Sequence, residues 1–595
     1  MKVILLLIAI TCLNVFIYSQ SDKRLKGVEK ELNEILEITK SAGFAVAVVK
    51  GNEIIYSKGF GYRDYENKIP VDNNTLFAIG SSTKAFTSSI LGQLRKEDKL
   101  SFDESPIKYV PDLKFFNDEM NNSIVIKDLM SHRTGLPRHD WSWYVFPTYD
   151  KDSLMRRIEF QEPFTGVRKQ WYYNNFMFLT QGVIAERITG KSWEENMYER
   201  LLKPLKMTRS NLSIKELRKA DNVALGYEIV DEKISKMDYY RIAGMSPAGS
   251  MNSSVNEMSN WLMTWLNKGK FEGNEIIPEA YINEAMSSQM VINGALPDDE
   301  FPDIHMATYG YGWMLSSYKG HYRVEHGGNI DGFSADVIFF PSDSIGIVVL
   351  ANQNGSSVPS LVRNTIADRL INVERTDWIK RYEDRKAEQE DVEVESEDAP
   401  TQKKQAPQHQ PKDFTGFYEN LGYGQFEIIV ENDSLFAVLP LWKLYLEHKH
   451  FDIYNSYKVT DEGIDISDEG LAFNFQIDNE GEIYNLKLKI EPTLQPLEFI
   501  RKPKTIDVEE TTLQSYVGKY DLSGTILKTY IKEKNSLYLF IKGQPEYELL
   551  PTDKHKFSFK VLDGFKVEFI ENKEGEIGEI KVIQPNGTFR AVKKK

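Results

Sequence analysis

A change of composition near residue 381 constrains the fold of this chain more than any other feature. Residues 381–411 include the run EDRKAEQEDVEVESEDAPTQKKQAPQHQP, which is charged, rich in Gln and Pro, and nearly without large apolar side chains. Such a segment buries too little apolar surface to fold alone, so we expect a solvated acidic linker. The parts before and after it must then fold around separate cores, as the length of 595 residues also indicates.

The part before the linker, residues 21–380, carries both strand and helix signals. FAVAVV and EIIYSKGFGY flank the tight turn KGN and predict a hairpin near its start. SADVIFFP and SIGIVVLAN, joined by PSDS, predict another hairpin near its end, with helical patterns between the two. We therefore expect an α+β domain in which distant ends of the chain share one antiparallel sheet flanked by helices, with an added helical subdomain.

The part after the linker alternates in the manner of β-strands and contains an internal repeat. GFY at 416–418 precedes SLF at 434–436, and GKY at 518–520 precedes SLY at 536–538. NEGEI at 479–483 is likewise echoed by KEGEI at 573–577. The repeat predicts two small β-barrel-like domains, residues 412–504 and 505–595, closed so that no strand edge is left open. One long β-sandwich with coincidental echoes is the alternative.

The first 20 residues read as a secretory signal peptide, with an early lysine, an apolar run and small residues near Ser19. An uncleaved membrane anchor is the alternative, although the apolar run is short for a span. We expect a secreted or periplasmic protein, or one on the outer cell surface. Cys12 is the only cysteine and lies in this segment, so the mature chain would have no disulfide and no thiolate site.

The formal charge of −15 argues against a nucleic-acid partner, because phosphate binding needs a basic face. No stretch after the first 20 residues is long and apolar enough to span a bilayer. His132 with His139, and His448 with His450, lack the carboxylate spacing of a metal site, and we expect neither a metal nor another cofactor.

The stretch IGSSTKAF, residues 79–86, places Ser81 three residues before Lys84 at the start of a predicted helix. Residues three apart lie on one helix face, so the two side chains can be hydrogen-bond neighbours. A lysine buried against an apolar face loses proton affinity and can act as a base. The pair is either a nucleophile with its own base, or a helix cap followed by a surface lysine.

Two further motifs turn this pair into a pattern. WYYNNFMFLTQG contains Tyr173 and Asn175 just before an apolar helix, and RVEHGGNIDGFSADVIFF contains His326 and two glycines before an inner strand. With the framework stretches LMSHRTGLPRHD, YGYGW and GGNIDGFSADVIFFP, this order resembles the penicillin-recognising serine hydrolases. That family includes AmpC-type β-lactamases, D-alanyl-D-alanine carboxypeptidases, D-aminopeptidases and related esterases. The resemblance covers about residues 30–375.

The resemblance implies a β-lactamase/transpeptidase-like catalytic domain and a role for each matched residue. Ser81 would be the acylated nucleophile, and Lys84 would assist its deprotonation. Tyr173 would carry a proton to the leaving group and act again in deacylation.

The remaining matched residues would bind the substrate. Asn175 would hydrogen-bond the substrate amide, and His326 would stand where relatives carry the Lys of Lys-Thr-Gly. The resemblance places the oxyanion hole at the backbone N–H groups of the nucleophilic serine and of Asn329. Gly327 and Gly328 would let a substrate strand approach the sheet closely.

His326 decides which branch of the family the chain resembles. A largely neutral imidazole holds a substrate carboxylate less firmly than an ammonium group does. This argues against efficient β-lactam destruction and favours a D-amino-acid-directed peptidase or amidase acting on small peptides or peptidoglycan fragments. A carboxylesterase fits almost equally well. Outside the enzymes, a catalytically silent penicillin- or peptidoglycan-binding protein is the alternative.

The two C-terminal units resemble the lipocalin-like barrels that D-aminopeptidases append to this catalytic domain. In such relatives the barrels can cover the active site, so restriction of the substrate by residues 412–595 is a hypothesis here, and the barrels could also drive oligomerisation. Arg138, His139 and Asp140 in LPRHD could line the cleft mouth, but we expect them to be turn residues.

Overall fold

The computed structural model of the chain describes residues 22–239, 242–293, 304–395 and 405–594, apart from 462, 468, 480, 503, 533–535, 563 and 585. The segment predicted as a signal peptide lies outside these residues. The structure divides into two units, Met1–Thr401 and Gln402–Lys595. Within the described residues, no helix is both long enough and apolar enough to cross a membrane.

The first unit is built on a nine-stranded antiparallel sheet with the order β10-β11-β12-β13-β14-β15-β1-β2-β3. Its strands are β1 (Gly43–Lys50), β2 (Glu53–Asp64), β3 (Ile69–Pro70), β10 (Met290–Asn293), β11 (Ala307–Tyr309), β12 (Met314–Tyr318), β13 (His321–Ile330), β14 (Phe333–Phe340) and β15 (Ile345–Ala351). β1 pairs with β15 from Phe44 opposite Ala351 to Lys50 opposite Ile345. The expectation that distant ends of the chain share one sheet is confirmed.

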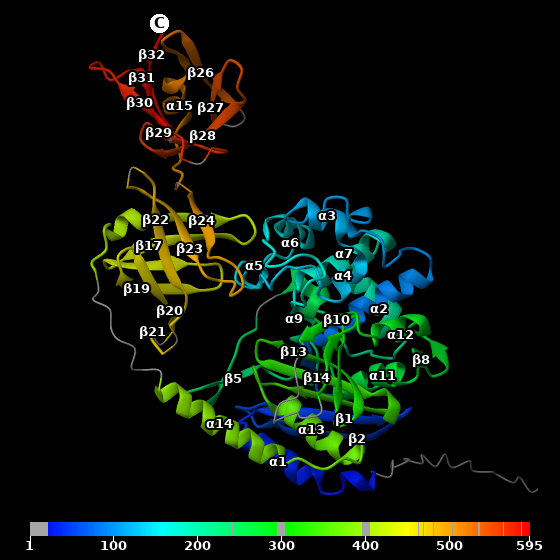
Figure 1. Ribbon diagram of the computed structural model, residues 1–595. Helices are drawn as coiled ribbons and strands as arrows, with labels where there is room; N and C mark the ends of the chain where they lie inside the picture. The colour runs from blue at the N-terminus through cyan, green and yellow to red at the C-terminus, as the bar shows by residue number, and fades with distance from the viewer. Residues whose placement is uncertain are drawn as a thin grey trace, which may run out of the picture. The chain divides into compact units, whose positions relative to one another are not determined.

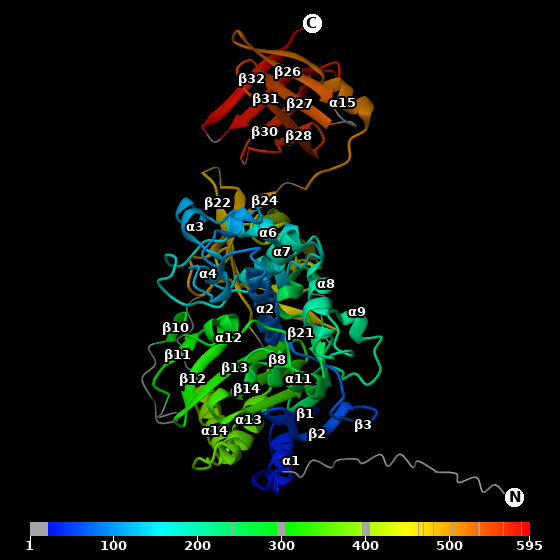
Figure 2. The same cartoon turned by 90° about the vertical axis from the view of Figure 1, so that its right-hand side faces the viewer.

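Helices cover both faces of this sheet (Figures 1 and 2). They are α1 (Val28–Ile38), α2 (Thr83–Lys96), α3 (Asp118–Ser123), α4 (Ile126–Met130), α5 (Trp141–Tyr144), α6 (Lys151–Arg157), α7 (Phe176–Thr189), α8 (Trp193–Met197), α9 (Ile214–Leu217), α10 (Ser246–Gly249), α11 (Val255–Leu266), α12 (Glu279–Ala285), α13 (Val358–Leu370) and α14 (Trp378–Glu395). Three short ribbons complete the unit: β4 (Phe77–Ala78) with β7 (Asn252–Ser253), β5 (Tyr227–Val230) with β6 (Lys233–Lys236), and β8 (Lys270–Phe271) with β9 (Asn274–Glu275).

The alternation of side chains along the central strands gives the sheet two cores. Val46 and Val48 of β1 pack with α1 and α13 on one face, while Ala45 and Ala47 pack with α2, α7 and α11 on the other. A strand buried on both faces has no polar alternation, which is why FAVAVV is a continuous apolar run. The helical subdomain lies on the face that carries α2.

The hairpins and helix ends that the local sequence predicts are confirmed. β1 and β2 form the first hairpin, and β14 and β15 form the second around the short 3₁₀ turn Pro341–Asp343. α7 stops at Gly190, whose φ of +69° suits a residue without a side chain. Ser192 and Glu195 form the expected capping box at the start of α8.

The predicted helix after Ser81 forms, but its environment differs from the expectation. A 3₁₀ turn, η2 (Gly80–Ser82), leads directly into α2. We expected one buried face, whereas every residue from Thr83 to Gly92 is buried. The hydroxyls of this helix make burial possible, since Thr87 donates to the carbonyl of Pro247 at 2.7 Å and Ser88 donates to Gln181 at 2.7 Å.

Part of the predicted linker is helical. α14 extends through Glu395, although residues 381–411 were expected to be a solvated segment. The helix is anchored before that segment, where the ring of Trp378 is buried and its Nε1–H donates to Asp368 at 3.0 Å. Charged residues such as Glu and Lys are good helix formers, so an anchored helix can continue into an exposed, charged sequence.

The second unit contains two barrels. The first consists of β16 (Gly416–Asn420), β17 (Gly424–Glu431), β18 (Ser434–Val438), β19 (Lys443–His450), β20 (Ile453–Thr460), β22 (Ala472–Ile477), β23 (Ile483–Leu488) and β24 (Leu497–Lys502), with β21 (Gly463–Asp465) attached to β20. Pairing of β19 with β20 closes the ring. The two end strands of the sheet are therefore paired, and this domain is a closed barrel rather than an open sandwich.

The second barrel repeats this plan. After α15 (Glu510–Tyr516) it consists of β25 (Gly518–Leu522), β26 (Thr525–Lys532), β27 (Ser536–Ile541), β28 (Glu546–Asp553), β29 (Lys556–Phe559), β30 (Lys566–Glu571), β31 (Ile577–Gln584) and β32 (Gly587–Lys593). Tyr418 of the first barrel donates to the carbonyl of Phe414 at 2.8 Å, and Tyr520 donates to that of Tyr516 at 2.9 Å. The echo of GFY and GKY is therefore a structural repeat.

Candidate active site

Ser81 and Lys84 meet at the beginning of α2. The Nζ atom of Lys84 lies 3.0 Å from Ser81 Oγ, 2.7 Å from Asn175 Oδ1 and 2.7 Å from the carbonyl oxygen of Ala248. The lysine side chain has no solvent exposure, whereas Ser81 is partly exposed. The structure therefore excludes the surface-lysine interpretation of this pair.

The three partners of Lys84 fit both the ammonium and the neutral amine. The carbonyl of Ala248 can only accept, and Asn175 presents its oxygen because its Nδ2 donates to Asp140 Oδ1 at 2.8 Å. A neutral amine has two hydrogens for these two acceptors and one lone pair left. Protonated Lys84 donates to Ser81 Oγ across the same 3.0 Å, whereas neutral Lys84 presents its lone pair there and can accept the proton of Ser81 directly.

Burial favours the neutral form. Desolvation lowers the pKa of Lys84 well below its usual value, and the positive charge of Arg138 lowers it further. The carboxylate of Asp140 acts in the opposite direction and raises the pKa of Lys84. Geometry and electrostatics thus agree that Lys84 is poised as a base.

Asp140 is part of this site, although the sequence favoured a turn residue. Its carboxylate accepts hydrogen bonds from Asn175, from Trp143 Nε1 at 2.7 Å and from Arg138 Nε at 2.5 Å. It thereby fixes the orientation of the Asn175 amide. In this structure Asn175 positions Lys84; its predicted contact with a substrate amide stays a prediction.

Tyr173 lies beside the pair. Lys84 Nζ is 4.9 Å from the centroid of its ring, and Arg138 Cζ lies at the same distance of 4.9 Å. The hydroxyl is buried and makes no hydrogen bond of standard geometry with any described residue. Burial raises the pKa of Tyr173 well above its usual value, while nearby Ser81 lowers it in part. Ser81, Lys84 and Tyr173 converge, with a protonated phenol available as a proton donor.

His132 supports the ring of Tyr173, and the sequence gave it no role there. The two rings lie 4.3 Å apart, and His132 Nδ1 accepts the backbone N–H of Asn174 at 3.2 Å. Its Nε2 is buried without a hydrogen-bond partner among the described residues, and burial lowers its pKa well below the usual value. The framework stretch LMSHRTGLPRHD was the signal, because it contains this histidine.

His326 is buried, and both of its ring nitrogens are engaged within the protein. Nδ1 lies 2.7 Å from the carbonyl oxygen of Gly327, so it carries the hydrogen, and Nε2 accepts from the hydroxyl of Tyr309 at 2.9 Å. Burial lowers the pKa of His326 to about 4. The ring is therefore neutral near pH 7, and its contact with substrate stays a prediction.

Two glycines bring strand β13 close to the start of α2. A first side-chain carbon on Gly328 would lie 2.0 Å from the carbonyl oxygen of Ile79 and 3.1 Å from Ser81 N. A carbon on Gly80 would lie 3.0 Å from Asn329 N. The backbone nitrogens of Ser81 and Asn329 therefore border one narrow gap, as the two donors of an oxyanion hole must.

The same part of β13 is open on one side. β12 pairs with β13 only as far as Glu325, and beyond it β13 continues to Ile330 without a sheet partner on that side among the described strands. Ser82 Oγ donates to the carbonyl oxygen of His326 at 3.0 Å, which satisfies the first of these backbone groups. The following backbone can pair with an extended substrate.

Comparisons with known proteins agree with this site. Residues 28–370 match the sequence family described as Beta-lactamase, and residues 400–501 match a domain of unknown function, DUF3471. No group of three or more His, Cys, Asp or Glu residues in the described chain could hold a metal ion.

Two curated relatives cover the catalytic unit. Protein flp of Staphylococcus aureus (strain N315) is 26% identical over 352 residues, which cover 58% of this chain and 67% of that protein. The unguisins hydrolase ungD of Aspergillus violaceofuscus (strain CBS 115571) is 26% identical over 439 residues, which cover 68% of this chain and 76% of that protein.

The fold also matches a solved structure. The octameric penicillin-binding protein homologue from Pyrococcus abyssi aligns with a TM-score of 0.54 and 21% identity, covering 80% of this chain and 100% of that one. This similarity concerns the fold alone.

Proposed function

The chain belongs to the Beta-lactamase family, and from that premise we propose that it hydrolyses amide or ester bonds of small substrates through an acyl-enzyme on Ser81. Its principal substrates would be short peptides or amides containing D-amino acids, such as peptidoglycan fragments. The observation that carries the proposal is the fully buried Lys84, whose Nζ lies 3.0 Å from Ser81 Oγ and whose pKa burial lowers.

Acylation begins when Lys84 takes the proton of Ser81 as Oγ attacks the substrate carbonyl carbon. The carbonyl oxygen becomes an oxyanion between the backbone N–H groups of Ser81 and Asn329. Collapse of this intermediate breaks the bond to the leaving nitrogen or oxygen, which takes the proton of the Tyr173 hydroxyl. Lys84 returns its proton to Tyr173, so both groups regain their starting states.

Deacylation repeats these steps with water as the nucleophile. Lys84 takes the proton as water attacks the ester carbonyl carbon, and Ser81 Oγ takes the proton of Tyr173 as the acid leaves. Lys84 then returns its proton to Tyr173. Tyr173 serves this relay because its buried hydroxyl has no competing hydrogen bond among the described residues. Neither step needs a metal or another cofactor.

The neutral state of His326 supports amides and esters over β-lactams. Relatives with Lys at this position have a cation for the substrate carboxylate, whereas here burial keeps the imidazole uncharged. The same observation favours a carboxylesterase, which needs no carboxylate clamp. The peptidase and the esterase differ in the leaving group that they release. A panel of amide and ester substrates therefore distinguishes the two activities.

The test is turnover by the wild-type protein and its Ser81→Ala variant on D-alanine and L-alanine p-nitroanilides, a short-chain p-nitrophenyl ester and a chromogenic cephalosporin. We expect serine-dependent release from the D-anilide and little from the cephalosporin. Release from the ester alone would establish the esterase. Equal rates for both proteins on all four substrates would leave only the silent penicillin- or peptidoglycan-binding protein.

We also propose that residues 1–20 direct export, so that the enzyme acts outside the cytoplasm on small substrates and not on nucleic acid. Amino-terminal sequencing of the protein from the producing cell tests export, with cleavage near residue 20 as the expected result. Assembly through the β-barrels is a further proposal, which the mass in solution with and without residues 412–595 tests.

A further inference from the structure

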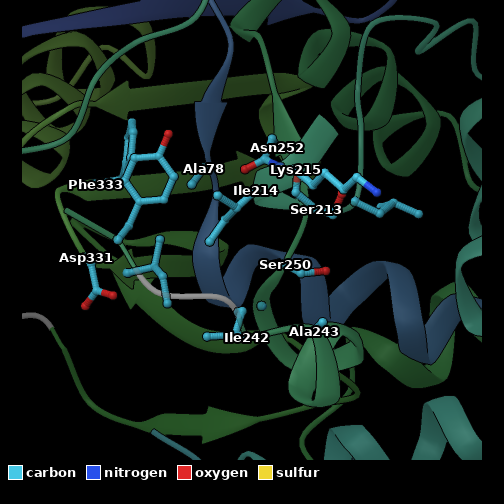
Figure 3. A pocket seen from close by; sticks show the side chains of 14 residues that line it. Ala78, Ser213, Ile214, Lys215, Ile242, Ala243, Ser250, Asn252, Asp331 and Phe333 are labelled. Carbon is cyan, nitrogen blue, oxygen red and sulfur yellow. Dashed lines mark hydrogen bonds between the residues drawn. The ribbon is translucent and has the colours of Figure 1, made fainter. Parts of the chain in front are cut away.

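A pocket opens between β4, α9, the α10 region and the adjoining ends of β13 and β14 (Figure 3). Its cavity volume is about 110 Å³ and it is partly open to solvent, which is space on the order of one amino-acid side chain. Its lining residues are Ala78, Leu212, Ser213, Ile214, Lys215, Tyr239, Ile242, Ala243, Gly249, Ser250, Asn252, Ile330, Asp331 and Phe333. Tyr173 and His132 are not among them.

The pocket adjoins the catalytic groups at two points. Gly249 directly follows Ala248, whose carbonyl oxygen accepts from Lys84. Ile330 directly follows Asn329, the predicted second oxyanion donor. The pocket therefore borders the residues that directly follow Ala248 and Asn329.

The wall is mainly apolar. The rings of Tyr239 and Phe333 meet edge to face with centroids 5.5 Å apart, and Ala78, Ile214 and Ile242 surround the same space (Figure 3). Lys215 is exposed, and its side chain extends away from Phe333 in Figure 3. Such a surface gains free energy by removing a hydrocarbon or aromatic group from water.

We propose that this acyl pocket receives a branched aliphatic or aromatic side chain on the acyl part of the substrate, the part that becomes bonded to Ser81. This inference rests on the proposed function. The carbonyl oxygen of the substrate lies between the backbone nitrogens of Ser81 and Asn329, and the leaving group must reach the hydroxyl of Tyr173. The remaining substituent of the carbonyl carbon then enters the acyl pocket.

Gly249 lines the pocket without a side chain. A first side-chain carbon there would lie 3.6 Å from the carbonyl carbon of Gly80 and 3.8 Å from Ile242 Cδ1, which are ordinary contacts. The backbone can therefore carry a larger residue at position 249, and the rest of that side chain must occupy space that the substrate would use. Gly249 is thus a specificity residue.

The experiment compares kcat/KM for the p-nitroanilides of alanine, leucine and phenylalanine, using whichever enantiomer is turned over. The wild-type protein should prefer leucine or phenylalanine to alanine by about tenfold or more, since even one methylene in an apolar pocket is worth that much. Gly249→Leu should reduce this ratio by about tenfold. Asn33→Leu adds the same side chain on the exposed surface of α1 and should keep the wild-type ratio.

Ile242→Ala provides a second variant, which enlarges the pocket instead of filling it. It should move the preference further towards phenylalanine. A wild-type protein that shows no preference among the three acyl groups, or a ratio that changes equally in Gly249→Leu and Asn33→Leu, overturns the inference while leaving the hydrolase intact. Absence of Ser81-dependent turnover on every substrate instead refutes the proposed function, and the acyl pocket with it.

Discussion

Replacement of Gly328 by alanine adds a single methyl group and thereby tests the oxyanion hole. The added carbon would lie 2.0 Å from the carbonyl oxygen of Ile79, whereas ordinary contact begins at 3.4 Å. Strand β13 and the turn before α2 must therefore separate by about 1.4 Å. The movement draws Asn329 N away from Ser81 N, although each must lie within about 3 Å of the same oxyanion.

The expected loss follows from what one oxyanion donor contributes. Removal of such a donor costs about a hundredfold to a thousandfold in kcat, or about 3 to 4 kcal/mol of transition-state stabilisation. A shift of about 1 Å at a reacting group has a comparable cost. We therefore expect kcat of Gly328→Ala to fall about a hundredfold or more.

The assay is steady-state hydrolysis of the best serine-dependent substrate, together with thermal unfolding to confirm that the variant folds. Gly327→Ala is the matched comparison, because its added carbon would meet only the carbonyl oxygen of Ala335, at 3.5 Å. It should lose far less activity than its neighbour. A folded Gly328→Ala variant with kcat within about fivefold of the wild type would refute the reasoning, because the loss of one donor costs far more than that.

Two further predictions concern pH. Arg138→Gln removes a charge that lowers the pKa of Lys84 and should move the acid limb of the kcat/KM profile to higher pH, whereas Asp140→Asn should move it to lower pH. Shifts in the same direction would contradict the assigned charges. For stability, burial lowers the pKa of both His139 and His326 to about 4 from the usual 6.5, so the unfolded state binds protons first as pH falls. Urea unfolding should show a loss of about 2 kcal/mol per histidine between pH 7 and pH 5, and equal stability at both would contradict their burial.

The sequence predicted those structural elements that depend on interactions between neighbouring residues. Capping of α8 by Ser192 and termination of α7 at Gly190 depend on neighbouring residues only, and both are confirmed. The barrels were predictable because their repeat places equivalent residues, such as Tyr418 and Tyr520, in equivalent strands.

Other features depend on contacts between distant segments. Asp140 orients Asn175 because a short loop meets the start of α7, and nothing within LPRHD indicates that contact. The burial of Lys84 likewise required knowledge of Ala248, which lies 164 residues away in the chain. α14 was missed because charge composition indicates exposure but does not distinguish an exposed helix from a linker.

The most direct test of the account is labelling by a fluorophosphonate, followed by intact-mass measurement and peptide mapping. The account predicts one adduct per chain, located on Ser81, absent from Ser81→Ala and formed much more slowly in Lys84→Met, because that variant retains the nucleophile but not its base. An adduct at another residue, or equal labelling of Lys84→Met and the wild-type protein, would contradict the claim that Lys84 activates Ser81.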